Sequence, residues 1–222
     1  MIAELLPAEV AAEDITGLDP DAELLPEEQV LVARAVAKRR TEVANVRVAA
    51  RRALARIGVP PVPILRGERG APLWPSGIVG SMTHTAGYCA AAVADAGKIR
   101  SVGIDAEEYD KLPDGVLDAV ALPDEQAMIK RLGTATHWDR LLFSAKESTY
   151  KAWFPLTGRW LGFEDALITI DPDQQTFRVK LLVDGATEDG PPLTSFDGRF
   201  LVRDGYVLTA ITVVPATSGS PS

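Results

Sequence analysis

Three carboxylates occupy positions from which they could act together on a charged substrate. Asp105 and Glu107 are two residues apart in a strand-like segment, so their side chains point to the same face. Glu147 lies in a segment with helical periodicity, one turn before Lys151. Neighbouring carboxylates repel each other unless a cation or a basic group lies between them. Three oxygen donors without a Cys/His cluster favour a hard cation, so the sequence predicts an Mg²⁺ site at these carboxylates, ahead of Zn²⁺.

Each of these residues also has an ordinary structural explanation. A Glu–Lys pair one helical turn apart, such as Glu147 and Lys151, is commonly a surface ion pair contributing about 0.3–0.5 kcal/mol. Asp105 and Glu107 could equally mark the exposed end of a strand near a turn. The functional interpretation therefore depends on the rest of the chain.

A basic segment supplies the missing partner. The whole chain carries a net charge of −8, but residues 34–69 contain only Glu42 and Glu68 as acids against a series of basic residues: Arg34, Lys38, Arg39, Arg40, Arg47, Arg51, Arg52, Arg56, Arg66 and Arg69. Mg²⁺ usually keeps coordination positions for substrate phosphate, and an arginine cluster also attracts anions. The two sets together predict a phosphate-containing ligand. The alternative is a solvated helix face, whereas nucleic acid is disfavoured by the overall negative charge and the lack of interleaved aromatic residues.

Two further segments could contribute polar groups to such a ligand. Residues 66–75 form a loop in which glycine permits close backbone approach and proline fixes the path of the chain. A structural turn with Trp74 in the core explains this loop equally well. His84 follows Thr83 at the end of a strand-like segment, a position that would suit contact with phosphate, although a lone histidine is more often structural.

Hydrophobic periodicity predicts the elements that position these residues. Helices are expected over 26–57, 115–122, 124–132 and 138–153, and strands over 78–84, 88–94, 99–107, 166–170, 177–183, 200–203 and 206–213. Residues 1–25 are expected to form an irregular arm. Thr136 with Asp139 predicts a capping box before the last helix, and Pro155 predicts its end. Short connections favour an antiparallel meander for the first three strands.

This order predicts an α+β fold of two similar halves, each a long helix packed on a small antiparallel sheet. The halves would divide near residue 110, with the basic segment, Asp105 and Glu107 in 1–110 and the helix carrying Lys146, Glu147 and Lys151 in 111–214. Residues 215–222 are expected to be a disordered tail. No repeat between the halves is evident in the sequence.

Composition indicates the setting of the protein. The chain has no apolar run as long as the roughly 18 residues of a membrane span and no apolar N-terminal export signal. Cys89 is the single cysteine, so an intrachain disulfide is impossible and a small core residue is expected there. These features predict a cytoplasmic protein.

Four short blocks together resemble the 4′-phosphopantetheinyl transferase superfamily. Residues 143–152, Phe-Ser-Ala-Lys-Glu-Ser-Thr-Tyr-Lys-Ala, resemble its Lys-Glu-(Ala/Ser)-x-Tyr-Lys signature, and residues 102–107, Val-Gly-Ile-Asp-Ala-Glu, resemble its Gly-(Ile/Val)-Asp-x-Glu signature. Residues 70–75 and 81–84 resemble the two upstream blocks. The blocks occur in the family's order within residues 30–165. They are most similar to the longer, single-chain, pseudo-dimeric Sfp/EntD type, which serves siderophore, polyketide and nonribosomal peptide synthesis.

The resemblance implies a reaction in which the 4′-phosphopantetheine arm of coenzyme A moves to a serine of an acyl or peptidyl carrier protein, leaving adenosine 3′,5′-bisphosphate. By matching positions it implies that Asp105, Glu107 and Glu147 bind Mg²⁺, with Mn²⁺ as a possible substitute. Glu147 would deprotonate the serine, directly or through a water, and Lys151 would neutralise the leaving phosphate. The coenzyme A contacts implied in this way are Arg39, Arg47, Arg66, Thr83, His84, Asp105, Lys146 and Lys151. The arginine that meets the 3′-phosphate stays open among Arg39, Arg40 and Arg47. A monomer without nucleic-acid or membrane partners is expected.

Two other functions use the same residues. An Mg²⁺-dependent hydrolase of nucleotide diphosphates would replace the carrier serine with water, and it would cleave its substrate without any acceptor protein. A non-catalytic module that binds coenzyme A or an acidic partner through residues 34–69 would keep its affinity when Asp105 is replaced by alanine.

Overall fold

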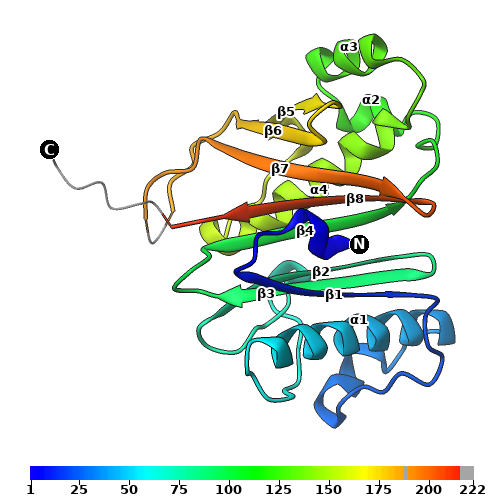
Figure 1. The fold of residues 1–222 in the computed structure, drawn as a ribbon, viewed down its shortest axis with the longest axis vertical. Coiled ribbons are helices and arrows are strands. Elements are labelled where there is room, and N and C mark those ends of the chain that lie inside the picture. Colours follow the sequence, from blue (N-terminus) through cyan, green and yellow to red (C-terminus); the bar gives the residue numbers. More distant parts are fainter. Residues whose placement is uncertain (188–189, 216–222) are drawn as a thin grey trace, which may run out of the picture.

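Two antiparallel sheets, each covered by one long helix, form the framework of this computed structural model, which describes residues 1–187 and 190–215 (Figure 1). The first sheet has the strand order β1-β3-β2 and the second the order β4-β8-β7-β6-β5. The elements in chain order are η1 (Ile2–Leu5), β1 (Val10–Thr16), η2 (Pro26–Val32), α1 (Ala37–Arg56), η3 (Glu68–Gly70), β2 (Ile78–Thr85), β3 (Tyr88–Asp95), β4 (Ser101–Glu108), α2 (Val116–Val120), α3 (Pro123–Leu132), α4 (Trp138–Thr157), η4 (Phe163–Asp165), β5 (Ala166–Asp171), β6 (Thr176–Leu181), β7 (Ser195–Arg203) and β8 (Tyr206–Val213). The predicted α+β class is confirmed.

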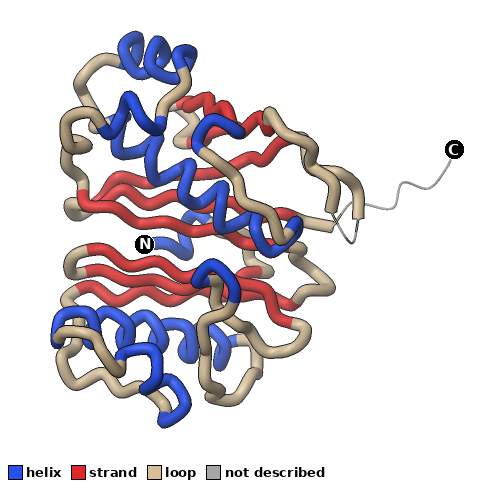
Figure 2. The backbone as a smooth tube through the Cα atoms, turned by 180° about the vertical axis from the view of Figure 1, so that it is seen from behind, coloured by secondary structure: helices blue, strands red, loops and turns tan. Residues whose placement is uncertain are grey.

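The two long helices bury their apolar faces against their own sheets (Figure 2). In α4 the predicted stripe is buried, and Leu141 and Leu142 have no exposed surface. Burying one such leucine contributes roughly 1.5–3 kcal/mol, so this stripe fixes the rotation of α4 about its axis. In the first half, α1 packs Ala49, Ala53 and Leu54 against β3, whose small side chains let the helix come close.

The two sheets meet at β2 and β4 without a backbone ladder between them. The Ser81 hydroxyl accepts a hydrogen bond from the Ile104 amide at 3.1 Å, and the Thr83 hydroxyl accepts one from the Ala106 amide at 3.1 Å. The predicted meander of three consecutive strands is therefore wrong, because β4 forms its ladder with β8. Although β4 precedes the predicted division near residue 110, its ladder joins it to strands from the end of the chain.

The N-terminal third differs from prediction in two places. Residues 1–25 are not wholly irregular, since Val10–Thr16 pairs with β3 as an edge strand and Ile2 is buried. The single helix expected over 26–57 is divided into η2 and α1, with Val36 in an extended conformation between them. Tertiary hydrogen bonds to the buried Glu28 hold η2 as a separate turn, and periodicity alone cannot reveal such bonds.

Both predicted ends of α4 also need correction. Residue His137 is the N-cap and Thr136 forms no capping box, because the Asp139 carboxylate instead accepts a hydrogen bond from the Leu112 amide at 2.9 Å. Pro155 lies within the last turn, and the helix ends at Gly158 in the left-handed conformation. A proline this close to the end removes one hydrogen-bond donor without breaking the helix, since few backbone bonds follow it.

The halves share a sequence repeat that the expectation of no repeat overlooked. Leu25-Pro26-Glu27-Glu28-Gln29 corresponds to Leu122-Pro123-Asp124-Glu125-Gln126. Glu28 and Glu125 are fully buried, and each accepts one bond from the leucine amide three residues earlier and another from a distant isoleucine amide. A motif of five residues is too short to stand out in a chain of this length without the matching contacts.

Three expectations concern the remainder of the chain. Cys89 is buried in β3, as predicted. Among the described residues, no helix is both long enough and apolar enough to cross a membrane. The predicted disordered tail lies outside the described residues from position 216 onward.

Candidate active site

A cleft of about 490 Å³ opens where the two halves meet, and a smaller pocket of about 170 Å³ adjoins it. Both are lined by Gly70, Pro72 and Met82, so the predicted loop 66–75 forms their common wall. The larger cleft contains Glu147, Lys151 and many apolar side chains, and the smaller contains the basic residues Arg39, Arg47, Arg66 and His84. One predicted acid, Glu147, and part of the predicted basic set therefore lie on adjoining surfaces.

Asp105 is the buried centre of the acidic set. Its side chain is 6% exposed and lies on the face of β4 turned toward α4. One carboxylate oxygen accepts a hydrogen bond from the Ser144 hydroxyl at 2.8 Å, and the other pairs with the Lys151 ammonium at 2.8 Å. The Thr83 hydroxyl also donates to this carboxylate at 3.3 Å. Residues of β2, β4 and α4 thus meet at this one carboxylate.

Glu107 is held by an arginine from the first turn of α4. The Arg140 guanidinium donates to the Glu107 carboxylate at 3.0 Å and also to the carbonyl oxygens of Asp110 and Lys111. Burial and the charge of Asp105 together raise the pKa of Glu107 to about 7, against the opposing effect of Arg140. Arg140 therefore offsets only part of the cost of ionising Glu107.

Glu147 comes close to Asp105 because α4 packs tightly on β4. Gly103 allows this approach, since a methyl group at its position would overlap the Ser148 carbonyl oxygen and the backbone of Ala152. Burial and the charge of Asp105 raise the pKa of Glu147, while Lys151 lowers it. Within the part of the chain that the structure describes, the Glu147 carboxylate has no hydrogen-bonding or ion-pair partner. It remains available to a ligand in the cleft.

These carboxylates satisfy the chemical requirements of a hard cation. The charge of Asp105 raises the pKa of both Glu107 and Glu147, so a cation among the three would relieve repulsion that Lys151 and Arg140 relieve only in part. Their donors are all oxygens, as Mg²⁺ prefers. In residues 1–187 and 190–215 no three Asp, Glu, His or Cys side chains already cluster as a metal site. Binding would therefore require the Lys151 ammonium to leave Asp105.

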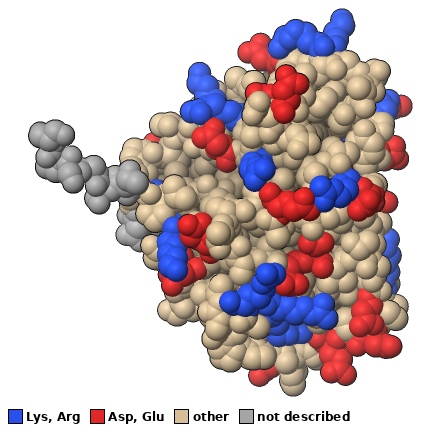
Figure 3. All heavy atoms as spheres, viewed as in Figure 1, with Lys and Arg blue, Asp and Glu red and all other residues tan. Residues whose placement is uncertain are grey.

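The smaller pocket gathers positive charge from both ends of the basic segment. Arg39 in the first turn of α1 contacts His84 and pairs with Glu42 at 3.1 Å. Burial and the neighbouring Arg39 lower the pKa of His84, so its imidazole is neutral at pH 7 and can donate a hydrogen bond. Arg47 and Arg66 complete the wall of the pocket. Figure 3 shows that basic and acidic side chains are otherwise interspersed over the face that it draws.

Lys146 is the one predicted site residue whose charged group lies elsewhere. Its side chain is 2% exposed, and its ammonium pairs with Glu125 at 2.9 Å and donates to the carbonyl oxygens of Phe163 and Ala166. These three acceptors satisfy its three protons. The structure therefore places Glu147 and Lys151 in the cleft, with Asp105 bonded to Lys151 and Thr83, and Arg39, Arg47, Arg66 and His84 in the smaller pocket. Lys146 belongs to the interior of the second half, and the three carboxylates form no metal-binding cluster among the described residues.

Sequence reasoning missed three polar residues of α4 in the site. Arg140 and Ser144 hold Glu107 and Asp105, and the buried Tyr150 hydroxyl has no hydrogen-bond partner among the described residues. A signal for two of them was present, because Arg140, Ser144, Glu147 and Lys151 recur at i, i+4, i+7 and i+11 on one helical face. A polar stripe opposite a buried apolar stripe usually predicts a solvent-exposed helix face, so the pattern alone does not indicate a site.

Comparison with known proteins identifies the family to which the chain is similar. The 4′-phosphopantetheinyl transferase N-terminal domain family matches residues 27–94, and the 4′-phosphopantetheinyl transferase superfamily matches residues 101–209. The 4′-phosphopantetheinyl transferase PptT of Mycobacterium tuberculosis is 54% identical over 226 residues, spanning 96% of this chain and 98% of that protein. The 4′-phosphopantetheinyl transferase Npt of Nocardia iowensis is 53% identical over 219 residues, spanning 95% of this chain and 99% of Npt.

A more distant relative matches a shorter stretch. Enterobactin synthase component D of Escherichia coli (strain K12) is 36% identical over 118 residues, which span 52% of this chain and 55% of that protein. Matches to both halves, together with relatives that span almost the whole chain, agree with the resemblance of the four sequence blocks. The chain therefore belongs to the 4′-phosphopantetheinyl transferase superfamily, and it transfers the phosphopantetheine group of coenzyme A to carrier proteins.

Proposed function

We propose that the cleft between the halves aligns the pyrophosphate of coenzyme A, an Mg²⁺ ion and a serine of the carrier protein. The observation that carries this proposal is the position of Asp105, which pairs with Lys151 and raises the pKa of both Glu107 and Glu147. Glu147 and Lys151 line a cleft that adjoins a pocket containing arginines. Phosphoryl transfer needs positioning and charge neutralisation more than covalent help from the protein. Carboxylates alone would repel coenzyme A, and arginines alone would not activate a serine.

The nucleotide end of coenzyme A fits the smaller pocket. Arg39, Arg47 and Arg66 there would bind its phosphates, with a hydrogen bond from the neutral His84. The larger cleft has an apolar lining suited to the uncharged pantetheine arm, and the unpartnered Tyr150 hydroxyl offers it a hydrogen bond. This assignment leaves Lys146 outside the contact with coenzyme A that the resemblance implies.

Asp105, Glu107 and Glu147 would hold the Mg²⁺ ion in this arrangement. The ion, or Mn²⁺ in its place, supplies charge neutralisation at the pyrophosphate when it is bound. Thr83 and Ser144 would keep Asp105 in position, since both donate hydrogen bonds to its carboxylate. Arg140 would do the same for Glu107.

Glu147 is the proposed base. A serine hydroxyl is a weak nucleophile unless a neighbouring group takes its proton. The Glu147 carboxylate lines the cleft, has no partner among the described residues, and has a raised pKa, which strengthens it as a proton acceptor. It would accept the serine proton directly or through a water. Lys151 would then face the leaving phosphate of adenosine 3′,5′-bisphosphate once it has released Asp105.

The acceptors are proposed to be acyl and peptidyl carrier proteins. Carrier proteins are typically acidic, so part of the basic segment would also steer their approach. The name of enterobactin synthase component D points to siderophore synthesis as one pathway to test, alongside polyketide and nonribosomal peptide synthesis. The enzyme is proposed to act as a cytoplasmic monomer without a nucleic-acid partner.

The decisive experiment incubates the protein with coenzyme A and a panel of apo-carrier proteins, with and without Mg²⁺, and reads intact mass. We expect one phosphopantetheine group to be added to a serine of at least one carrier protein only when Mg²⁺ is present, with release of adenosine 3′,5′-bisphosphate. Cleavage of coenzyme A at the same rate without a carrier protein would instead support a hydrolase. Transfer at an unchanged rate in a chelator would contradict the metal assignment.

A further inference from the structure

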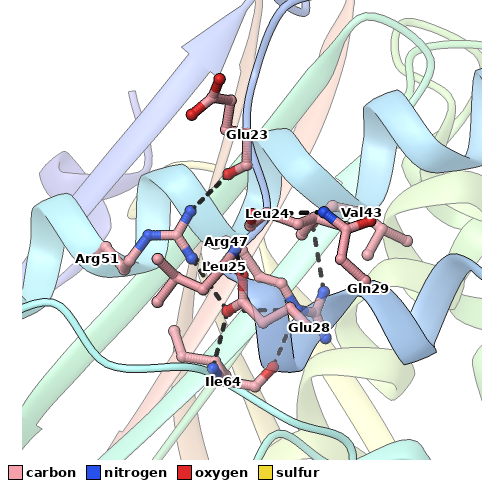
Figure 4. A network of polar contacts seen from close by, with 9 residues as sticks. All are labelled: Glu23, Leu24, Leu25, Glu28, Gln29, Val43, Arg47, Arg51 and Ile64. Atoms are coloured by element: carbon pink, nitrogen blue, oxygen red, sulfur yellow. Dashed lines mark hydrogen bonds and ion pairs between the residues drawn. The ribbon is translucent and has the colours of Figure 1, made fainter.

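A fully buried glutamate lies directly behind the basic pocket. Glu28 accepts hydrogen bonds from the Leu25 amide at 2.9 Å and the Ile64 amide at 2.8 Å, and its two oxygens lie 3.0 and 2.8 Å from the Arg51 guanidinium. Figure 4 shows its carboxylate at the centre of this network, between η2, α1 and the segment that carries Ile64. A buried carboxylate with this many donors is held rigidly.

Glu28 is connected to the pocket through Arg47 and Ile64. The Arg47 Nε atom donates to the Ile64 carbonyl at 2.9 Å and lies 4.0 Å from a Glu28 oxygen, while Nη1 donates to the Val43 carbonyl at 3.3 Å. The peptide groups of Ile64 are therefore held by Glu28 on the amide side and by Arg47 on the carbonyl side. Arg66 follows two residues later, so the same clamp fixes the start of the loop that brings Arg66 to the pocket.

Glu28 also compensates a charge that is costly to bury. The Arg47 side chain is only 5% exposed, and burial lowers the pKa of its guanidinium to about 10. The positive charges of Arg66, Arg51 and Arg39 lower this pKa further, and the carboxylate of Glu28 opposes them. Without that negative charge, several guanidinium groups would repel one another across a small pocket.

The second half contains the same glutamate without the pocket. Glu125 accepts from the Leu122 amide at 2.7 Å and the Ile168 amide at 2.7 Å, as Glu28 does from Leu25 and Ile64. Its basic partner is Lys146, whose other two bonds go to carbonyl oxygens in the interior. Glu125 is therefore an internal control for Glu28, because it makes the same backbone hydrogen bonds without a basic pocket beside it.

We propose that Glu28 is a positioning residue for coenzyme A, holding the Arg47 guanidinium and the segment leading to Arg66 so that both face the phosphates. Glu28 itself does not touch the ligand. The inference rests on the proposed function of the basic pocket. According to this inference, the anion-binding pocket needs the buried Glu28 carboxylate behind it to bind coenzyme A well.

The test compares Glu28→Gln with Glu125→Gln, two matched changes that each remove one buried charge and keep the shape of the side chain. For Glu28→Gln we expect the KM for coenzyme A to rise on the order of tenfold, with kcat changed by less than about twofold, as for other residues that act through a ligand-binding neighbour. The affinity for coenzyme A, measured by calorimetry without a carrier protein, should fall by the same factor. Glu125→Gln should lower the thermal midpoint but leave both coenzyme A values unchanged.

Three outcomes would overturn the inference. They are a wild-type coenzyme A affinity in Glu28→Gln, a fall in kcat with an unchanged KM, and an equal loss of affinity in both variants, which would indicate general destabilisation. If Glu28→Gln does not fold, Glu28→Asp and Glu125→Asp take its place, and only the first should weaken coenzyme A binding. Calorimetry separates the two proposals, because a wild-type protein that binds coenzyme A but modifies no carrier protein would contradict the proposed function alone.

Discussion

The two halves of the molecule share a similar framework, but the first half presents arginines to the site and the second presents Glu147 with Lys151. Each half places a buried glutamate behind the long helix that covers its sheet, and each glutamate binds the same two kinds of backbone amide. In the first half the helix turns Arg39 and Arg47 toward a pocket, whereas in the second it buries Lys146 and turns Glu147 and Lys151 toward the cleft. The two halves thus share the interior hydrogen bonds of the buried glutamate but differ in the charged residues that they turn toward the junction.

Replacing Glu147 with glutamine should cause the largest change in activity. Loss of the proposed base should slow transfer to a carrier protein by about 10²–10⁴-fold, because the serine would lose the group that takes its proton. The thermal midpoint should stay near that of the wild type, since the carboxylate has no partner in the described residues. Single-turnover mass spectrometry and thermal unfolding measure the two effects.

The matched control is Glu108→Gln, which changes an exposed carboxylate at the end of β4. It should leave transfer within about twofold of the wild type, as expected for a surface charge. Wild-type turnover in a folded Glu147→Gln protein would remove Glu147 from the catalytic assignment.

Replacing Lys146 with methionine should affect stability most strongly. Removing one partner of a buried ion pair leaves Glu125 uncompensated, which typically costs about 3–5 kcal/mol of unfolding free energy. Denaturant unfolding measures this loss. At temperatures where the variant is folded, its KM for coenzyme A should equal that of the wild type.

This variant also decides between two predictions for Lys146. Family resemblance implies a contact with coenzyme A, whereas the position of the ammonium in the interior implies a structural role. A raised KM for coenzyme A in folded protein, with little change in unfolding free energy, would support the contact. The double variant Glu125→Gln with Lys146→Met should recover part of the stability, because it removes both buried charges and keeps a side-chain oxygen as a backbone acceptor.

Replacing Ser81 with alanine tests the junction between the halves. The buried Ile104 amide would lose its acceptor, at a cost of about 1–3 kcal/mol in unfolding free energy. Thr169→Val, an exposed change in the middle of β5, is the control and should change stability by less than about 0.5 kcal/mol. Equal stabilities of Ser81→Ala and the wild type would show that the hydroxyl contributes nothing to the contact between the sheets.

Features set by neighbours along the chain were predicted correctly, whereas features set by contacts between distant residues were not. The helical stripe of α4 and the shared face of Asp105 and Glu107 depend on neighbours along the chain, and both were predictable from period alone. The pairing of β4 with β8 and the break between η2 and α1 depend on contacts between distant residues, which leave no periodic signal. The pairing of Lys146 with Glu125 was not predictable for the same reason, because Glu125 lies on another helix.

The site was predictable as a set of charges, but its internal connections were not. Four sequence blocks carry the three acids, and also the loop and the histidine that line the cleft and pocket. The residues that hold them, Ser144, Arg140 and Glu28, are defined by the atoms they contact rather than by their own neighbours in sequence. A single sequence therefore indicates which groups take part more readily than it indicates what positions them.

The smallest expected effect concerns Cys89, whose alkylation rate tests how closed the core of the first half is. Burial raises the pKa of its thiol from the usual range to about 12. Only the thiolate reacts with iodoacetamide, so at pH 8 a rise of about three pKa units lowers the reactive fraction roughly a thousandfold, and burial blocks access besides. Intact mass should show no alkylation of the native protein over an hour and one adduct in denaturant. Rapid alkylation of native protein at pH 8 would mean that β3 separates from α1 on that timescale.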